Sequence, residues 1–531
     1  MQKVLVANRG EIALRVFRAA RELGLKTVAV VAPDDSGSLH ARSADQTVEI
    51  ASYLSSEEHI RAAAQSGADA IHPGYGFLAE SGDFAEAVQT AGLTWIGPPP
   101  VPLRAGGDKL AAKRIAHEAG VPTIPEVEDP PLIVKAAAGG GGRGMRVVRS
   151  AAELDEALDA ARREAKAAFG DDRVYLERYL ERPRHVEIQL LADTHGTVLS
   201  LGERDCSVQR RHQKVLEESP SPALDAGLRT RMSDAAVLFA QAIGYVGAGT
   251  AEFVVEGRDF YFLELNGRIQ VEHPVTELVT GVDLVQWQLR IAQGEPLDVR
   301  PEPHGHAVEV RLYAEDPRTF LPQAGRVDRL RLPTSIRVDA GVAEGDEIGT
   351  GYDPMIAKLI AAGATRDEAL DRLADALAET EVTGVTTNLP FLRWLVAHPA
   401  LRAGEVTTAF LTEHPPLSAP PALLPGPVWR GAFRLNLPPP ALAPPPDIDA
   451  AAHTSSGAEA SSVVTAPMPG TVLKVHVAAG STVKARQPLV VLEAMKMETP
   501  LTSPYDATVR AVHVQEGDRV AGGAVLVELD E

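Results

Sequence analysis

The chain has little cysteine and no excess of positive charge. Cys206 is the one cysteine among 531 residues, which excludes an intramolecular disulfide framework and a CxxC metal site and is typical of a reducing compartment. Lysine and arginine number 52 against 72 aspartates and glutamates, giving a formal net charge of −20. This balance argues against broad binding to nucleic acid or to an anionic membrane, because both attract basic surfaces.

Membrane, secretion and dinucleotide signals are missing as well. No apolar run reaches the roughly 18 residues of a transmembrane helix, and the first ten residues carry charge too early for a secretory signal. We therefore expect a cytoplasmic protein. The first turn reads NRGEIA instead of GxGxxG, and no GxxxxGK[ST] pattern occurs, so nicotinamide-binding and ordinary P-loop sites are disfavoured.

The first hundred residues or so alternate between predicted strands and predicted helices. An apolar run at 4–7 precedes residues 11–24, whose apolar positions follow a helical period, and 26–32 reads as a second strand. A helix over 79–91 continues the pattern, which predicts a parallel sheet covered by helices. Mixed helix and strand then extend to residue 412, with strands at 306–316 and 335–341 and a helix at 366–380.

Composition changes near residue 413. Twelve prolines lie between Pro415 and Pro446, and the Ser/Ala-rich stretch 453–462 reads as a flexible tether. A short strand is predicted at 428–436. The last segment repeats itself with an offset of 37, because APMPGTVLKVHVAAG at 466–480 matches SPYDATVRAVHVQEG at 503–517. Two such halves predict a small antiparallel sandwich with approximate two-fold symmetry.

The sequence EAMKME at 493–498 falls where the first half of the repeat meets the second, which places Lys496 at a hairpin tip. A lone lysine at a turn usually serves solubility, but exposed methionines on both sides favour a recognised tag. The segment 463–531 resembles a biotin carboxyl carrier domain, and the resemblance implies biotin in amide linkage to Lys496. A lipoyl domain has a related fold, but its lysine usually follows Asp and precedes Ala.

Four clusters carry chemistry in the larger part of the chain. A glycine run, Gly139–Gly142, follows Lys135 on a strand, and such runs let backbone N–H groups approach phosphate oxygens. Strand alternation puts Glu264, Asn266 and Arg268 on one face, with Glu252 on the preceding strand. Carboxylate and amide oxygens that converge on one face suit Mg²⁺, and the alternative is a solvated sheet face.

The third cluster is basic and the fourth is a single residue. Arg210, Arg211, His212 and Lys214 are suited to a small anion, although they could equally be surface charges balanced by Glu217 and Glu218. Arg311 lies on the face of a predicted strand, and by itself it does not indicate a function.

Together these clusters resemble the biotin carboxylase family of ATP-grasp enzymes, on the motifs HPGYGFLAE, GGGGRGMRVV, ERDCS-QRRHQK, RIQVEHPVTE and YDPMIAKL. With the carrier segment the resemblance covers roughly nine-tenths of the chain. It implies an α/β and α+β multidomain protein. The implied units are an N-terminal carboxylase domain of parallel βαβ type (1–105), an ATP-grasp domain with a glycine-rich lid (106–305), an α+β C-terminal carboxylase domain (306–412), a Pro-rich linker (413–462) and an all-β biotinyl sandwich (463–531).

The resemblance also implies a role for each motif residue. Nucleotide contacts are implied for Lys109, Lys135, Glu177, His185 and His212, with Gly139, Gly140, Gly141 and Gly142 as a lid over the phosphates. Glu252, Glu264 and Asn266 are implied to serve Mg²⁺, with Mn²⁺ as the alternative ion. Lys214, Arg268, Gln270 and Val271 are implied to hold bicarbonate. The implied catalytic residues are Glu272 as base, Arg311 on the biotin side, Lys214 and Arg268.

These roles amount to ATP-dependent carboxylation of biotin on Lys496, within an acyl-CoA carboxylase. The implied partners are a separate carboxyltransferase subunit that handles the acyl-CoA, a biotin protein ligase and an oligomeric complex. Rival readings are another ATP-grasp ligase, such as a carbamoyl-phosphate-forming enzyme, and a lipoylated or inactive scaffold.

Three departures from the family pattern stand out. The stretch between Pro122 and Ile133 is short where a further helix is usual. Ala138 and Gly267 replace a frequent glycine and a residue that is commonly a hydroxyl side chain or proline. Only about 50 residues replace a β-rich domain that docks the partner in some fused members.

Overall fold

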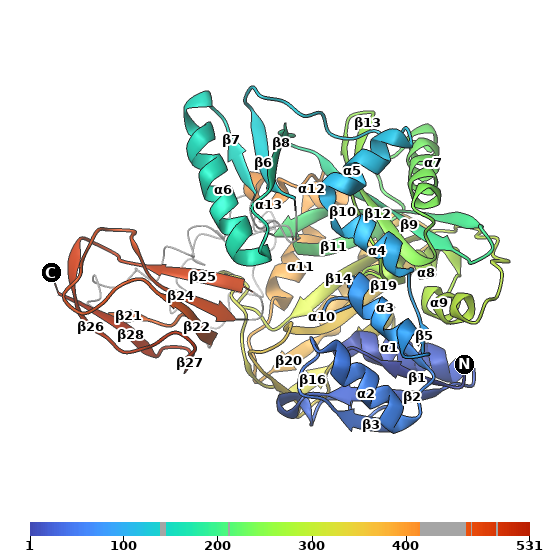
Figure 1. Ribbon diagram of the computed structural model, residues 1–531, viewed down its shortest axis with the longest axis horizontal. Coiled ribbons are helices and arrows are strands. Elements are labelled where there is room, and N and C mark those ends of the chain that lie inside the picture. Colours follow the sequence, from blue (N-terminus) through green and yellow to red (C-terminus); the bar gives the residue numbers. More distant parts are fainter. Residues whose placement is uncertain (138–144, 211–212, 415–462, 469, 495–496, 531) are drawn as a thin grey trace, which may run out of the picture.

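The N-terminal part of the chain forms a five-stranded parallel sheet. The structure is a computed structural model that describes the chain except residues 138–144, 211–212, 415–462, 469, 495–496 and 531. The sheet is parallel, as the βαβ pattern predicts, and its strand order is β3-β2-β1-β4-β5. Helices α1, α2 and α3 lie beside it (Figure 1). Its elements are β1 (Lys3–Val6), α1 (Gly10–Glu22), β2 (Lys26–Val31), a 3₁₀ turn η1 (Pro33–Asp35), β3 (Gln46–Glu49), α2 (Ser56–Ser66), β4 (Ala70–His72), α3 (Gly82–Thr90), β5 (Thr94–Trp95) and α4 (Pro100–Gly107).

A small three-stranded sheet with one long helix follows. The sheet has the order β7-β6-β8 and packs apolar side chains such as Leu132 and Val134 against Ala161 of the helix. Its elements are α5 (Lys109–Glu118), β6 (Leu132–Ala136), β7 (Arg146–Val148), a 3₁₀ turn η2 (Ala151–Glu153), α6 (Leu154–Phe169) and β8 (Val174–Arg178).

The short connection between α5 and β6 contains no helix. The Pro122 carbonyl accepts a hydrogen bond from Phe262 N–H (2.8 Å), and the Pro125 carbonyl accepts one from Arg178 N–H (3.0 Å). The connection is therefore held between the small sheet and the next one.

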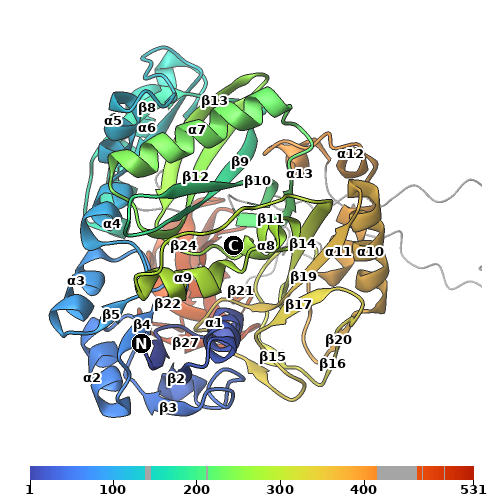
Figure 2. The same ribbon diagram turned by 90° about the vertical axis from the view of Figure 1, so that its right-hand side faces the viewer.

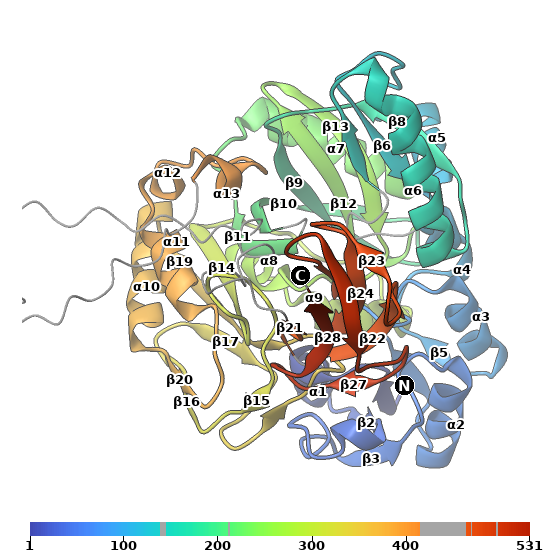
Figure 3. The ribbon, with the colours of Figure 1, turned by 90° about the vertical axis from the view of Figure 1, so that its left-hand side faces the viewer.

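An eight-stranded sheet forms the centre of the molecule, in the order β13-β12-β9-β10-β11-β14-β19-β17. Helix α7 covers one face near β9 and β10 (Figure 2), and α10 and α11 lie side by side along β14 and β19 (Figure 3). The first elements are β9 (Arg184–Ala192), β10 (Val198–Arg210), β11 (Gln213–Ser219), α7 (Ala226–Ala242), β12 (Gly247–Glu256), β13 (Asp259–Asn266), α8 (His273–Thr280) and α9 (Leu284–Ala292).

The same sheet continues across the predicted boundary at residue 305, because β11 pairs with β14. The elements beyond it are β14 (His306–Tyr313), β15 (Gly325–Arg326), β16 (Arg329–Arg331), β17 (Arg337–Ala340), β18 (Glu347–Ile348), β19 (Met355–Gly363), α10 (Arg366–Glu379), β20 (Glu381–Thr383), α11 (Leu389–Ala397), α12 (Pro399–Arg402) and α13 (Phe410–Glu413). The linker and the strand predicted at 428–436 lie outside the described residues.

The C-terminal segment is a sandwich of two four-stranded antiparallel sheets, as predicted. Their orders are β21-β28-β26-β23 and β25-β24-β22-β27. Each sheet takes strands from both halves of the 37-residue repeat, which is why the two halves share one core. The strands are β21 (Val463–Thr465), β22 (Gly470–Val475), β23 (Thr482–Val483), β24 (Pro488–Ala494), β25 (Met497–Thr502), β26 (Ala507–Val512), β27 (Arg519–Val520) and β28 (Val525–Asp530).

Two residues connect β24 to β25, which pair through Ala494 and Met497. Lys496 is one of them and lies outside the described residues. The flanking strands nevertheless form the hairpin that the sequence predicts.

Among the described residues, none of the helices combines the length and the apolar character that crossing a membrane requires.

Candidate active site

The site lies at the end of the β12–β13 hairpin. Glu252 and Glu264 are direct cross-strand partners, and Asn266 follows two residues later on the same face, as the alternation predicts. All three side chains line a cavity of about 340 Å³.

Most of the predicted site residues meet in this cavity. Its lining consists of Lys109, Lys135, Met145, Tyr175, His185, Gln209, Gln213, Lys214, Glu252, Leu263, Glu264, Asn266, Arg268, Gln270, Val271, Glu272 and Arg311. Glu177 lies behind the wall, where it accepts a hydrogen bond from Lys135 Nζ (2.7 Å) and pairs with Lys113 Nζ (3.0 Å). Residues Gly139–Gly142 and His212 lie outside the described residues.

Lys214 is the electrostatic centre of the cavity. Its Nζ donates to Glu187 Oε2 (2.5 Å), Glu252 Oε1 (2.8 Å) and Glu272 Oε1 (2.7 Å). Burial lowers the pKa of this lysine, but the three carboxylates outweigh burial and hold its pKa well above the usual value. The ammonium group is therefore charged.

Glu272 is ionised for a matching reason. Burial raises its pKa, but the cations Lys214, Arg311 and Arg204 outweigh burial and hold the pKa far below the usual value. Arg311 Nη2 donates to Glu272 Oε2 (3.1 Å) and also pairs with Glu217. A carboxylate between two cations is available to accept a proton once an anionic substrate draws those cations toward itself.

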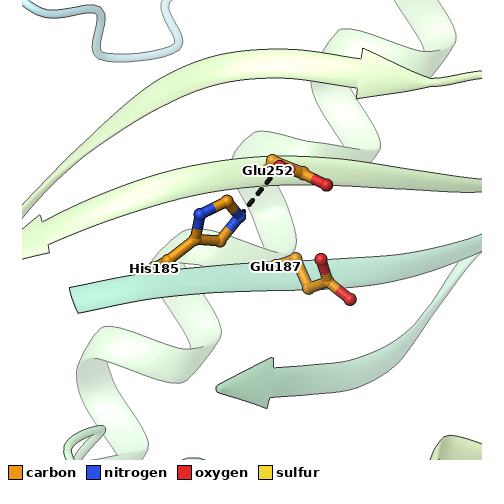
Figure 4. Close-up of side chains that lie close together, drawn as sticks. All are labelled: His185, Glu187 and Glu252. Atoms are coloured by element: carbon orange, nitrogen blue, oxygen red, sulfur yellow. Dashed lines mark ion pairs between the residues drawn. The ribbon is translucent and has the colours of Figure 1, made fainter. Parts of the chain in front are cut away.

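His185, Glu187 and Glu252 approach one another closely enough to suggest a metal site. Figure 4 shows His185 and Glu252 facing each other, with Glu187 on the same strand as His185. The His185 Nε2 to Glu252 Oε2 distance is 2.8 Å, and one potential ligand atom from each residue lies within 4.8 Å of the others. However, the Lys214 ammonium already bridges the two carboxylates. Burial lowers the pKa of His185, but Glu252 raises it above normal, which disfavours a metal ligand.

The predicted set of Glu252, Glu264 and Asn266 suits a magnesium ion better. All three offer hard oxygen atoms on one wall of the cavity, which is the donor type that Mg²⁺ prefers. Glu264 is the more accessible carboxylate, and Lys109 Nζ lies 3.5 Å from its Oε2. Glu252 Oε1 accepts from Lys214 and from Asn266 Nδ2, and Asn266 Oδ1 accepts from Arg268, so an ion would replace these contacts. The oxygen donors themselves are of the type that fits such an ion.

Arg268 is held from two sides. Its Nη2 donates to Asn266 Oδ1 (2.9 Å), and its Nε lies 3.2 Å from Glu80 Oε2. The other carboxylate oxygen, Glu80 Oε1, accepts a hydrogen bond from Gly267 N–H (3.2 Å). A Cβ at position 267 would meet Leu103 Cδ2 at 2.8 Å, and because this atom ends a flexible side chain, a shift of Leu103 would accommodate a larger residue.

A second cavity, of about 530 Å³, adjoins the first and shares Lys135, Met145, His185, Gln209 and Leu263 with it. Its other walls come from the small sheet, from the segment after β8, from β12 and from residues 408–412. They include apolar Ile133, Leu180, Val254 and Leu411 together with charged side chains such as Arg178 and Glu181. A flat apolar group fits such a wall, whereas the first cavity suits charged groups.

The structure describes Arg210 and Lys214 of the predicted basic cluster, and these two have different partners; Arg211 and His212 lie outside the described residues. Lys214 lies in the cavity, whereas Arg210 pairs with Glu315 through two bonds (2.6 and 3.0 Å). The alternative of surface charge balanced by Glu217 and Glu218 is wrong, because both carboxylates are buried. Both glutamates lie on a strand inside the central sheet, and each forms an ion pair there. Glu217 pairs with Arg311, and Glu218 pairs with Arg366.

Sequence reasoning also missed the buried support of the cavity. Arg204 is fully buried and donates to Glu187 Oε1 (2.5 Å) and Gln270 Oε1 (3.0 Å). The alternation His185-Val186-Glu187-Ile188-Gln189 could have pointed to Glu187, because it puts three polar side chains on one strand face.

Four family models match the chain. Their descriptions are biotin carboxylase, N-terminal domain (residues 1–103), carbamoyl-phosphate synthase L chain, ATP binding domain (108–300), biotin carboxylase C-terminal domain (309–413) and biotin-requiring enzyme (462–529).

Individual proteins match as well. The chain is 48% identical over 445 residues to the methylcrotonoyl-CoA carboxylase alpha subunit of Arabidopsis thaliana, covering 78% of this chain and 61% of that subunit. It is 48% identical over 441 residues to the biotin carboxylase of Haemophilus influenzae, covering 78% and 98%. The biotin carboxylase domain of the Hydrogenobacter thermophilus 2-oxoglutarate carboxylase, solved with MgADP, ADP and bicarbonate, is 43% identical with a TM-score of 0.76, covering 78% and 98%.

The small lid-like sheet, the central sheet and the charged cavity define an ATP-grasp protein. The chain belongs to the biotin carboxylase family, and it carries a biotin-requiring-enzyme domain at residues 462–529. The family and the multidomain fold predicted from the sequence are thereby confirmed. The matched part spans about three-fifths of the plant subunit.

Proposed function

We propose that the chain carboxylates biotin carried on its own Lys496, with ATP and bicarbonate, as a subunit of an acyl-CoA carboxylase. The observation that carries the proposal is the cluster of Lys214, Glu272 and Arg311 inside a charged cavity of a chain that also has the EAMKM hairpin. The Arabidopsis relative is an alpha subunit of this kind, and the Hydrogenobacter structure holds bicarbonate and MgADP.

Nucleotide binding divides between the two cavities. The apolar wall at Ile133, Leu180 and Leu411 suits the base, and Lys109, Lys135 and His185 lie where phosphates would enter the charged cavity. Glu177 orients Lys135, while Gly139–Gly142 and His212 complete the predicted set. Glu252, Glu264 and Asn266 would hold Mg²⁺, which offsets negative charge on the phosphates.

Bicarbonate would bind between Lys214, Arg268 and the backbone N–H groups of Gln270 and Val271. It enters as an anion and draws Lys214 away from Glu272, which raises the proton affinity of that carboxylate. Glu272 then removes the bicarbonate proton as the oxygen attacks the γ-phosphate. The bond between the γ-phosphorus and the bridging oxygen of the β-phosphate breaks, and the products are carboxyphosphate and ADP.

The acceptor end of the site is Arg311. Biotin would supply a ureido nitrogen. Carboxyphosphate would divide into CO₂ and phosphate, the phosphate would take the ureido N–H proton, and the nitrogen would bond to the CO₂. Arg311 keeps a positive charge beside that position, since its pKa is raised well above normal by Glu217 and Glu272 in spite of burial.

The remaining assignments concern partners. A carboxyltransferase subunit would receive the carboxyl group and hand it to an acyl-CoA, and a biotin protein ligase would modify Lys496. An oligomeric complex and a cytoplasmic location stay predictions, as do the domain boundaries drawn from the sequence.

The test uses protein produced together with a biotin protein ligase. We expect ADP release that depends on bicarbonate and is stimulated by free biotin. Glu272→Gln should lower this rate at least 10²-fold and leave ATP affinity nearly unchanged, because the amide cannot accept the proton. The matched control is Glu256→Gln on β12, whose carboxylate is exposed and is not among the residues that line either cavity.

Two results would contradict the proposal. Retained turnover in Glu272→Gln would reject this residue as the base. An unmodified mass for the peptide that contains Lys496 would reject the carrier role.

A further inference from the structure

The motif YDPMIAKL at 352–359 contains a buried cation that the proposed reaction does not use. Lys358 lies on β19, directly across from Arg311 on β14, and its side chain is 0% exposed. A buried ammonium group is costly unless hydrogen bonds and negative charges compensate it. Its surroundings therefore indicate what it stabilises.

Three acceptors surround the Lys358 ammonium group. Nζ donates to the backbone carbonyl of Val271 (2.9 Å), and it lies 3.2 Å from Glu11 Oε1 and 3.9 Å from Asp339 Oδ2. Val271 lies in the cavity wall, Glu11 on α1 and Asp339 on β17. The lysine thus joins the N-terminal sheet region to the central sheet at the loop that carries the proposed base.

The neighbouring carbonyl of this loop is held in a similar way. His273 Nδ1 lies 2.7 Å from the Gln270 carbonyl. Burial and the nearby cations Lys358, Arg15 and Arg337 hold the pKa of His273 well below normal, so the imidazole is neutral and its Nδ1–H is the donor.

A peptide is planar, so holding the Gln270 carbonyl orients the Val271 N–H, and holding the Val271 carbonyl orients the peptide that leads into Glu272. Within the described part of the chain, neither Gln270 N–H nor Val271 N–H donates to a protein acceptor, although both residues line the cavity. Unpaired N–H groups on a restrained loop form a preorganised anion site.

Glu11 extends the connection to a second loop. It lies in the first turn of α1 and accepts a hydrogen bond from the Tyr75 hydroxyl. The Tyr75 hydroxyl and the Val271 carbonyl are therefore connected through the Glu11 carboxylate and the Lys358 ammonium group.

We propose that Lys358 is a positioning residue for the reaction with bicarbonate. It holds the Val271 carbonyl and thereby the peptide that leads into Glu272, so that the base is presented to the cavity, while His273 holds the Gln270 carbonyl and thereby the Val271 N–H. The inference rests on the proposed function and adds a residue that does not itself touch the substrate.

The test compares Lys358→Met with the double variant Lys358→Met/Glu11→Gln in the full-length biotinylated protein. Loss of the lysine alone leaves a buried carboxylate uncompensated and lowers the melting temperature. The double variant removes both charges and should recover much of that loss. In both variants we expect KM for bicarbonate to rise on the order of 10-fold with a comparable fall in kcat, while KM for ATP changes less than about 2-fold.

The matched control is Arg366→Met. Arg366 pairs with buried Glu218 through two bonds (2.6 and 2.9 Å) and has no contact with the loop. Its loss should lower the melting temperature and leave KM for bicarbonate unchanged. This comparison separates positioning from stability.

A second readout is binding of ¹³C-labelled bicarbonate, followed by its NMR relaxation in the presence of the protein. The inference would be overturned, and the proposed function would stand, if the wild-type protein binds bicarbonate and cleaves ATP while the double variant keeps the wild-type KM and bicarbonate binding. Wild-type protein that neither binds bicarbonate nor responds to it would overturn both the inference and the proposed function. A rise in KM confined to bicarbonate supports the inference.

Discussion

Two buried carboxyl groups face each other beside the site, and each holds a proton more tightly than an ordinary glutamate. Glu217 and Glu309 are cross-strand partners on β11 and β14, and both side chains are fully buried. Burial raises the pKa of Glu217 to about 7, with Arg311 and Lys214 opposing and Glu272 adding to the shift. Burial also raises the pKa of Glu309 well above normal. The cations Lys358 and Arg311 lower this pKa, whereas the carboxylates Glu217 and Glu272 raise it further.

These shifts predict a loss of stability as pH rises. An unfolded glutamate titrates at about 4.3, so between that value and about 7 the Glu217 carboxyl binds more protons in the folded than in the unfolded chain, and its contribution to stability falls with rising pH. Glu217→Gln is neutral in both states and should remove up to about 3 kcal/mol of this decline. Calorimetric melting temperatures at pH 5, 6, 7 and 8 measure this decline for the wild type and the variant. If the two plots of melting temperature against pH are parallel, the prediction is refuted. Glu256→Gln should follow the wild-type curve.

In the C-terminal sandwich, the repeat makes two glycines equivalent. Gly480 N–H donates to the Val509 carbonyl and Gly517 N–H to the Val472 carbonyl, both at 2.7 Å, and each pair maps onto the other with the offset of 37. Both glycines have positive φ, 87° and 93°, and a Cβ at either would meet no atom within 4 Å. The requirement for glycine is therefore one of backbone conformation.

Gly480→Ala and Gly517→Ala should each destabilise the sandwich by about 1–2 kcal/mol, because an L-residue pays this conformational cost at positive φ. The unfolding transition of the C-terminal segment, followed by hydrogen exchange in the full chain, measures both variants. Gly349→Ala, at an open position with ordinary φ in the carboxylase part, should leave this transition unchanged. A large difference between the two repeat variants would contradict the equivalence.

Elements with a clear period were predictable from the sequence. The βαβ start, the helix at 366–380 and the repeat in the last segment all formed where the pattern predicted them. The Glu252–Glu264 pairing was predictable too, because a short hairpin connects the two strands. These elements and this pairing depend on the spacing of residues that are close together in the sequence.

Features that depend on distant strand pairing were not predictable. Glu187, Glu217 and Glu309 come together because β9, β10, β11 and β14 are neighbours in one sheet. Without that order, a charged residue on an alternating strand reads as solvent-facing. The buried pairs Arg210–Glu315 and Arg366–Glu218 join residues 105 and 148 positions apart, which no local pattern reveals.

For the whole molecule, the proposed reaction requires the C-terminal sandwich to visit the cavity, and the sandwich belongs to the same chain. Each part has a hydrophobic core of its own. The segment that joins them, residues 415–462, lies outside the described residues, and its proline-rich sequence predicts a tether. A tether of this kind gives the carrier a local concentration on the order of millimolar at the site.

Cutting the tether after folding should therefore separate two activities. A specific protease site placed within residues 453–462 allows cleavage of the purified, biotinylated protein. At about 1 µM protein, carboxylation of the biotin on Lys496 should then slow on the order of 10²–10³-fold, because the reaction becomes bimolecular. ATP cleavage driven by free biotin should keep its rate, since the cavity and all its charged residues remain in one piece. Quench-flow with labelled bicarbonate measures the first rate and ADP release the second, and an unchanged first rate would show that the two parts stay associated without the covalent link.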